Sequence, residues 1–233
     1  MHIKIKNWKL ALLALVFFCF FISLGGWQLS RAQQKQALIA AFNQRTEQQP
    51  LTAAELSSHQ DLRFYRVTLE GRFDHQHTLL LDNKTFKRQV GYAVYTPFIA
   101  KGLAMPILID RGFVPSSGYR HLLPTIKTIP GNITITGMLN KPPTYVSLGG
   151  LLESKSITWP LRVQFIDLSQ LTSVLPYSLF AYVVNLSPDH PAAYPISWDI
   201  VISPPERHLG YALQWFALAL TLLVLFVVLN GKR

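Results

Sequence analysis

Two long apolar stretches near the ends of the chain constrain its fold more than any other feature. Leu10 to Leu29 is a run of 20 residues interrupted mainly by one serine, two glycines and one glutamine, and Leu209 to Leu229 is a run of 21 residues without a charge. At a rise of about 1.5 Å per residue, each forms a helix of roughly 30 Å, the thickness of a bilayer's hydrocarbon core. The sequence therefore predicts two transmembrane helices.

The basic residues at the two ends predict the orientation of these helices. Lys4, Lys6 and Lys9 precede the first apolar stretch, and Lys232 and Arg233 follow the second, with no acidic residue in either tail. Short basic tails remain in the cytoplasm, so both termini are expected there and the 179-residue loop between the spans is expected outside. A cleaved signal peptide is the competing interpretation of the first stretch, but no small-x-small cleavage site follows it, which favours an uncleaved anchor.

These features predict six parts of the chain. They are a cytoplasmic tail (1–9), a transmembrane helix (10–29), a helical extension (30–50), an extracytoplasmic β domain (51–208), a second transmembrane helix (209–229) and a cytoplasmic tail (230–233). The net charge of +10 falls to +5 for the loop once the basic residues of the tails are set aside. Because this charge is spread without a cluster, the sequence predicts a domain beside a lipid bilayer and no nucleic-acid partner. The only cysteine, Cys19, lies in the first span, so no disulfide is expected in the β domain.

Short runs of β-branched and aromatic residues, separated by turn formers, predict strands in the loop. The predicted strands are Tyr65 to Phe73, Thr78 to Asp82, Tyr92 to Phe98, Pro106 to Val114, Ile133 to Leu139, Arg162 to Ile166 and Phe180 to Leu186. We expect a mainly antiparallel sheet that closes toward a barrel or a sandwich. Residues 116–128 and 141–156 are expected to be long loops, and Asp167 to Leu175 a short helix with either Asp167 or Ser169 as its N-terminal cap.

Signatures of catalysis are mostly absent from the sequence. It contains no nucleophile elbow, no phosphate-binding glycine loop and no His-Glu-x-x-His motif, so no enzymatic activity is expected. His75 and His77 would share one face of a strand, a spacing that can hold a metal, but without a third ligand nearby we expect both to be solvated. An extracytoplasmic enzyme would become credible only with a buried carboxylate of strongly shifted pKa in a pocket of the β domain.

Polar and aromatic residues gather at the outer ends of both predicted spans. By helical spacing, each span has one such face. The faces consist of Leu24, Trp27, Gln28, Arg31 and Lys35 on the first helix, and His208, Tyr211, Ala212, Trp215 and Ala219 on the second. Gly25 and Gly26 are expected to let the helices approach closely, so that the two faces meet.

Two interpretations of these faces remain open. In the first, Trp and Tyr form an interfacial belt while Arg31, Arg207 and His208 extend to lipid headgroups. In the second, they bind a flat amphipathic ligand: His208 offers a nitrogen to a metal, aromatic faces stack on a macrocycle, and Arg31 or Arg207 pairs with carboxylates.

Several separated motifs resemble the Surfeit locus protein 1 family, membrane proteins required for assembly of haem-copper cytochrome c oxidase. The motifs are Gly26-Trp27-Gln28-Leu29 with Arg31 and Lys35, Arg63-Phe64-Tyr65-Arg66-Val67 with Gly71-x-Phe73, Gly91-Tyr92 with Thr96-Pro97-Phe98, Asp110-Arg111-Gly112-Phe113-Val114-Pro115, and His208-Leu209-x-Tyr211 with Trp215-Phe216. Their order between two spans covers nearly the whole chain. The sequence departs mildly from the family pattern at Phe113, where the family often has Trp.

The resemblance implies an assembly factor that binds haem a as cargo and aids its insertion into subunit I of cytochrome c oxidase. The haem-contacting histidine of the family corresponds to His208, which is then a ligand of the haem iron, and Trp215 corresponds to an aromatic residue further into the same helix. The expected cofactor-binding set is His208, Trp215, Tyr211, Trp27, Gln28, Arg31 and Arg207. Arg111 is expected to be a structural feature at the end of a strand.

The resemblance also implies partners and a location. The expected partners are subunit I of the oxidase, haem a synthase and the lipid bilayer, and the expected location is a bacterial inner membrane with the main domain in the periplasm. The alternative function is a membrane-tethered scaffold that stabilises subunit I through the β domain, at the loops 116–128 and 141–156, without binding haem.

Overall fold

The computed structural model describes residues 7–119, 122–143, 150–151, 157–196, 198 and 204–230. The chain forms two compact units, one of residues 1–41 with 200–233 and the other of residues 42–199. The first unit is helical and the second contains the sheet. Part of the predicted loop 141–156 lies outside the described residues.

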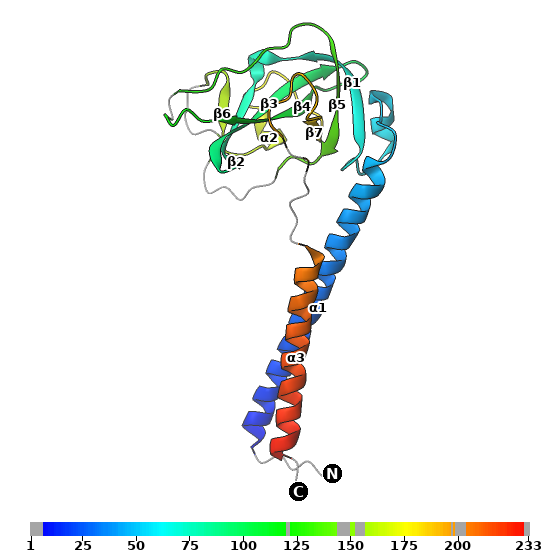
Figure 1. The fold of residues 1–233 in the computed structure, drawn as a ribbon, viewed down its shortest axis with the longest axis vertical. Helices are drawn as coiled ribbons and strands as arrows, with labels where there is room; N and C mark the ends of the chain where they lie inside the picture. The colour runs from blue at the N-terminus through cyan, green and yellow to red at the C-terminus, as the bar shows by residue number, and fades with distance from the viewer. Residues whose placement is uncertain are drawn as a thin grey trace. The chain divides into compact units, whose positions relative to one another are not determined.

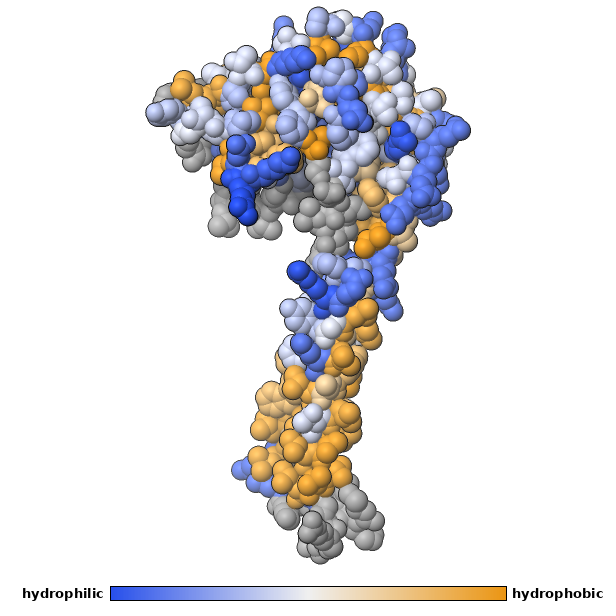
Figure 2. Space-filling view, viewed as in Figure 1, coloured by the Kyte–Doolittle hydropathy of each residue, from blue (hydrophilic) through white to orange (hydrophobic). Residues whose placement is uncertain are grey.

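The two long helices have the length and composition of membrane spans. Helix α1 (Trp8–Thr46) contains 39 residues, and helix α3 (Pro205–Asn230) contains 26. Helix α3 begins at Pro205, whose missing N–H costs nothing in the first turn, and Glu206 in that turn complements the helix dipole. Figure 2 shows hydrophobic residues over most of both helices, whereas the surface of the β domain is largely hydrophilic. The chain is therefore a membrane protein with two spanning helices.

Seven strands form one sheet in the second unit. They are β1 (Arg66–Phe73), β2 (Leu79–Phe86), β3 (Gln89–Ala100), β4 (Ile107–Pro115), β5 (Ile133–Asn140), β6 (Leu161–Val163) and β7 (Val183–Leu186). Their order is β1-β5-β7-β4-β3-β2-β6, and a further antiparallel pairing joins β1 to β3. Five strands, β1-β5-β7-β4-β3, therefore close into a barrel, which Figure 1 shows with β2 and β6 beside it. The predicted β domain is confirmed, and of the two predicted architectures it is the barrel that forms.

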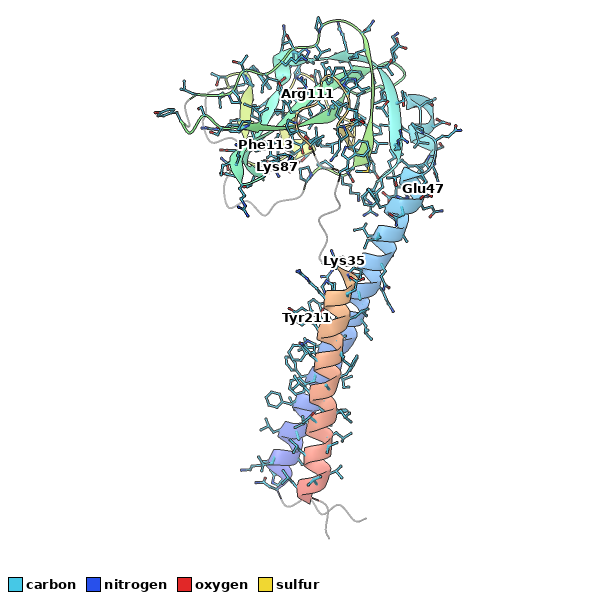
Figure 3. All side chains as sticks on the ribbon, in the orientation of Figure 1. Lys35, Glu47, Lys87, Arg111, Phe113 and Tyr211 are labelled. Carbon is cyan, nitrogen blue, oxygen red and sulfur yellow. The ribbon has the colours of Figure 1, made fainter. Side chains whose placement is uncertain are left out.

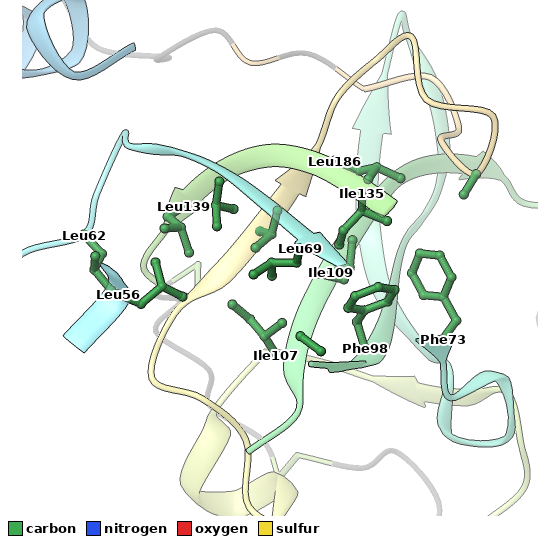
Figure 4. Packing of buried hydrophobic residues seen from close by; sticks show 14 residues of the cluster. Leu56, Leu62, Leu69, Phe73, Phe98, Ile107, Ile109, Ile135, Leu139 and Leu186 are labelled. Atoms are coloured by element: carbon green, nitrogen blue, oxygen red, sulfur yellow. The ribbon is translucent and has the colours of Figure 1, made fainter. Parts of the chain in front are cut away.

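The barrel encloses an apolar core. Val67, Phe98, Ile107 and Ile135 have no exposed surface, and they belong to the cluster that Figure 4 draws. They point inward because alternate residues of a strand face the same side. A second cluster, which includes Leu81, Leu161 and Leu171, packs under β2, β6 and the short helix α2 (Leu168–Leu171). The barrel is thus stabilised by its own packing, without a disulfide.

Strand β3 is the longest strand and pairs with three others. Its C-terminal end pairs with β1, where Gly71 lies opposite Ala100. Its N-terminal half pairs with β2, and most of its length, from Gly91 to Phe98, pairs with β4. A Cβ atom on Gly71 would lie 2.1 Å from the carbonyl oxygen of Ile99, so only glycine permits this closing contact.

Short elements outside the sheet differ in part from the sequence predictions. Asp167 caps α2 by accepting hydrogen bonds from the backbone N–H groups of Ser169 and Gln170, as expected, but the helix ends at Leu171. The 3₁₀ helix η1 (Ala53–Ser58) follows α1. A second 3₁₀ helix, η2 (His75–His77), occupies the position of the two histidines, so the prediction that they share a strand face is wrong.

Candidate functional site

A narrow seam of side chains joins α1 and α3. On α3 the buried or half-buried residues His208, Ala212, Trp215 and Ala219 recur every three or four positions, and on α1 Gly25 and Ala32 are buried. This spacing is that of helices that pack along one face at a small crossing angle. The seam therefore defines which residues of each helix face the other.

Gly25 and two aromatic rings set the closest approach of the helices. A Cβ atom on Gly25 would lie 2.5 Å from the ring of Phe216, so a larger residue fits there only if that ring moves. The rings of Phe21 and Trp215 stack with centroids 5.9 Å apart. A Cβ atom on Gly26, in contrast, would meet nothing within 4 Å, so the expectation of close approach holds at Gly25 and is wrong at Gly26.

One polar contact lies in the seam. Nδ1 of His208 is 2.8 Å from Oε1 of Gln28, and both side chains are partly buried. The predicted meeting of polar residues from the two spans is therefore confirmed for this pair. Because the amide oxygen can only accept, the imidazole donates through Nδ1, and in its neutral form it keeps the lone pair of Nε2. This tautomer is the one that binds a metal through Nε2 while a second residue orients the ring.

Four other predicted site residues lie away from the seam. Trp27 is 52% exposed and Tyr211 is 53% exposed, and Figure 3 shows Tyr211 on the outer side of α3. Arg31 lies over the Trp27 ring at 5.6 Å and donates to Gln34, and Arg207 is exposed. The expectation that each set occupies one inward face is therefore wrong for Trp27, Arg31 and Tyr211. Successive helix residues are separated by about 100°, so when Gln28 faces the partner helix Trp27 cannot.

The β domain contains a buried arginine that sequence reasoning placed wrongly. Arg111 lies in the middle of β4 rather than at its end, and it has no exposed surface. Its Nε donates to the carbonyl of Ala192 at 3.0 Å and its Nη2 to that of Lys127 at 2.8 Å. The rings of Phe73 and Tyr194 lie 5.3 and 5.2 Å from the guanidinium. Burial lowers the pKa of Arg111.

Arg111 therefore attaches two loops to the barrel wall through hydrogen bonds and cation–π contacts. These contacts support the structural role expected of Arg111, but the prediction that it lies at the end of a strand is wrong. The next residue, Gly112, has φ +106°, and a Cβ atom there would meet the Tyr194 carbonyl at 2.6 Å. Arg111 and Gly112 thus let the loop that contains Ala192 and Tyr194 pack closely against β4.

A partly buried carboxylate precedes this pair. Asp110 accepts a hydrogen bond from the Gly112 N–H at 2.9 Å and another from Tyr95. Burial raises its pKa to about 6, although these hydrogen bonds and the charge of Lys84 act in the opposite direction. Asp110 lines neither of the two cavities described below.

The two histidines of η2 are held by hydrogen bonds rather than solvated. Nε2 of His75 accepts from the Ile129 N–H at 2.8 Å, which ties η2 to a distant loop. Nδ1 of His77 lies 2.6 Å from the carboxylate of Asp74, which also accepts from Tyr177. The expectation that both are solvated is wrong, because residues far apart in sequence complete their contacts. Across the described part of the chain, no group of three or more His, Cys, Asp or Glu side chains is arranged to hold a metal.

Two cavities are notable. One of about 560 Å³ lies between α1 and α3 and is almost entirely apolar, with Trp8, Leu15, Phe18 and Leu222 among its walls. The other, of about 480 Å³, lies in the β domain beside His75, Thr128 and Trp159. The described side chains that line the second cavity include no carboxylate and no cysteine.

Comparison with known proteins places these features in a family. A model of the SURF1 family matches residues 15–220. A SURF1-like protein of Monosiga brevicollis is 26% identical over 90% of this chain and 83% of its own length, and a SURF1-like protein of Rickettsia felis is 26% identical over 94% and 96%. The human Surfeit locus protein 1 is 25% identical over 91% of this chain and 73% of its own length. The matches include both spanning helices and the barrel between them, and the chain belongs to the SURF1 family.

Proposed function

We propose that the chain is an assembly factor for haem-copper cytochrome c oxidase that binds haem a as cargo and aids its insertion into subunit I. Membership of the SURF1 family supports the assembly role. The Gln28–His208 contact supports the haem role, because it supplies an imidazole whose free nitrogen suits a metal. In this proposal the protein is a carrier and not an enzyme.

His208 and Gln28 act as a unit in this proposal. His208 would hold the haem iron through one imidazole nitrogen, and bound haem would supply that metal centre. Gln28 holds the other nitrogen of His208, which fixes the tautomer and restricts rotation of the ring. The Phe21–Trp215 stack and the Gly25–Phe216 contact keep the two helices close enough for that hydrogen bond. Trp215 thus contributes by positioning the helices.

The exposed residues around this pair have the chemistry that a porphyrin needs. Trp27 and Tyr211 present aromatic surface that can pack on a flat macrocycle. Arg31 and Arg207 are exposed cations that can pair with propionate groups. These four residues are therefore proposed to contact haem from outside the seam.

We also propose a location and partners. The basic tails favour cytoplasmic termini and a periplasmic β domain in a bacterial inner membrane. A carrier of haem a receives it from a source such as haem a synthase and delivers it to subunit I. Both of these proteins are therefore proposed partners.

The haem content of purified protein tests the proposal. The full chain is purified from cells that make haem a, and the haem-to-protein ratio and Soret band are compared between the native protein, His208→Ala and Gln28→Leu. We expect His208→Ala to lose most of its haem, and Gln28→Leu to retain an intermediate amount because the ligand remains but is no longer oriented. His59→Ala, in the β domain, serves as the control. Equal haem and an unchanged Soret band in native protein and His208→Ala would contradict the ligand role.

Assembly of the oxidase separates this function from the scaffold alternative. If the β domain alone stabilises subunit I, His208→Ala leaves oxidase activity of the membranes intact. If haem delivery is the function, the same variant lowers oxidase activity together with the haem a content of subunit I.

A further inference from the structure

The end of the β2–β3 hairpin projects from the sheet as a basic finger, which we define as residues 84–90. Within the finger, Lys84 pairs with Gly91 and Phe86 pairs with Gln89, so the two strands continue to the turn. Strand β6 pairs with β2 only from Leu79 to Leu81, and β4 pairs with β3 only as far as Gly91. The finger therefore extends beyond the strands on either side of it.

Two basic residues form the turn of the finger. Lys87 has φ +47° and Arg88 has φ +68°, the left-handed conformation that two-residue hairpin turns require and that Asn and Gly adopt most readily. Both side chains are exposed, and Figure 3 shows Lys87 at this end of the hairpin, near Phe113 of β4. The chain thus has two cations at positions where its backbone would be more stable with Asn-Gly.

The finger is held against β4 and the segment that follows it, and it also exposes an aliphatic side chain. The rings of Phe86 and Phe113 lie 5.6 Å apart, and Ser116 N–H donates to the carbonyl of Val90 at 3.0 Å, which fixes the finger to β4 and the segment after it. Val90 is nonetheless 62% exposed. Residues 84–90 contain three cations and no acid.

The charges at the tip have no partner of opposite sign within the described residues. Lys84 is partly buried and interacts with Asp110, whereas Lys87 lies over the Phe86 ring at 5.5 Å. In the described part of the chain, no carboxylate forms an ion pair with Lys87 or Arg88. The tip therefore offers two cations and an aliphatic side chain to an external anionic surface.

We propose that the basic finger binds the anionic phospholipid surface of the bilayer that holds the two spans. Lys87 and Arg88 would pair with headgroup phosphates, and Val90 would enter the boundary between headgroups and acyl chains. A bilayer is the occupant that the structure favours because the same chain is anchored in it at both ends, which keeps the finger at high effective concentration near the lipid.

Fluorescence quenching by lipids tests this contact in the full chain. Cys19 is replaced by Ser, Val90 is replaced by Cys and labelled with a fluorophore, and the protein is placed in nanodiscs whose lipids carry a headgroup nitroxide. We expect strong quenching in phosphatidylglycerol-containing nanodiscs and several-fold less in pure phosphatidylcholine. High salt should also reduce it, because exposed charges are screened. A label at Ile99→Cys, an exposed position at the opposite end of β3, serves as the control and should be quenched weakly in both lipids.

Two variants separate the charge of the finger from its folding. Lys87→Glu with Arg88→Glu reverses the charge, while Lys87→Asn with Arg88→Gly removes it and supplies the preferred turn residues. Both should lose the lipid-dependent quenching, although the second should unfold at a higher temperature than the native protein. Equal quenching in the two lipids, or quenching that the Asn-Gly variant retains, would overturn the proposal. Shielding of the label only after an acidic partner protein is added would also overturn it.

Discussion

The barrel and the helical pair bury their side chains in opposite ways. In the barrel, core residues such as Val67, Phe98 and Ile107 have no exposed surface. In the most apolar windows of α1 and α3, only 6% and 11% of the residues are buried. Removal of apolar surface from water drives the first arrangement, but a lipid chain is as apolar as leucine and gives no such drive to the second.

The difference teaches where each unit is vulnerable. The barrel depends on continuous packing and on strand closure, so a side chain that does not fit inside it should lower the stability of the whole barrel. The helical pair depends on a seam of small residues, on the Phe21–Trp215 stack and on the hydrogen bond between Gln28 and His208. Its outer surface should tolerate most apolar substitutions. Matched substitutions in the two units should therefore differ widely in their effects.

Closure of the barrel should be the most sensitive point. Gly71→Val places a side chain against the Ile99 carbonyl, where even a Cβ atom would lie at 2.1 Å, so we expect a loss of about 3 kcal/mol or more in the free energy of unfolding. Thermal unfolding of the full chain, followed by near-ultraviolet circular dichroism, measures this loss. Arg72→Val, at the exposed neighbouring position, should change stability by less than about 0.5 kcal/mol. Equal melting of the two variants would mean that the β1–β3 contact does not hold the barrel closed.

The pH dependence of stability should report on the partly buried Asp110. Its pKa is raised to about 6 in the folded protein, so the folded state binds the proton more tightly than the unfolded state. This contribution is complete below the unfolded pKa of about 4 and is lost as the pH rises through the folded pKa, by on the order of 3 kcal/mol. Asp61, whose pKa is lowered first by its hydrogen bond with Arg63, acts in the opposite direction and loses its contribution as the pH falls.

Substitution isolates the Asp110 contribution from the others. Asp110→Asn keeps an oxygen for the Gly112 N–H but has no proton to lose, so its stability relative to the native protein should rise between about pH 4 and pH 7. Chemical unfolding at several pH values gives this difference. Asp189→Asn, on an exposed loop, is the control. A constant difference between Asp110→Asn and the native protein across this range would exclude a raised pKa.

Substitutions in the helical seam should cost less stability, and only those at the contact itself should change the separation of the helices. Gly25→Val collides with the Phe216 ring, which can move, so we expect a cost of about 1 to 3 kcal/mol and a wider separation of the helices. Gly26→Val meets no neighbour and should leave the pair unchanged. Spin labels at the exposed positions Trp8 and Leu229, in a Cys19→Ser background, report the distance distribution by electron resonance. Identical distributions in the two variants would show that Gly25 does not set the approach.

Local patterns predicted most of the secondary structure. All seven strands form where β-branched and aromatic runs alternate with turn residues, because that alternation matches the period of a half-buried strand. The two apolar helices follow from length and composition. Asp167 was recognisable as a helix cap because its carboxylate precedes the backbone N–H groups that it binds.

Contacts between distant residues explain what the sequence did not reveal. The β1–β3 closure depends on a glycine opposite a strand 29 residues away, and the burial of Arg111 depends on carbonyls at Lys127 and Ala192. In the helical pair, each span is apolar on all sides, so its hydrophobic pattern does not indicate which face contacts the other helix. Gln28 and His208 could be anticipated as a polar pair in lipid, whereas the outward direction of Trp27 and Tyr211 could not.

The place of β7 in the barrel has a consequence for how the chain folds. Strand β7 lies between β4, with which it pairs in parallel, and β5, with which it pairs antiparallel. It is also the last strand of the barrel along the chain. Until Val183–Leu186 emerges during synthesis, β4 and β5 remain open edges with unpaired backbone groups. The barrel thus completes shortly before the second span is made, and folding intermediates with open edges are prone to aggregation. Truncation before β7 should leave an aggregating open sheet rather than a smaller barrel.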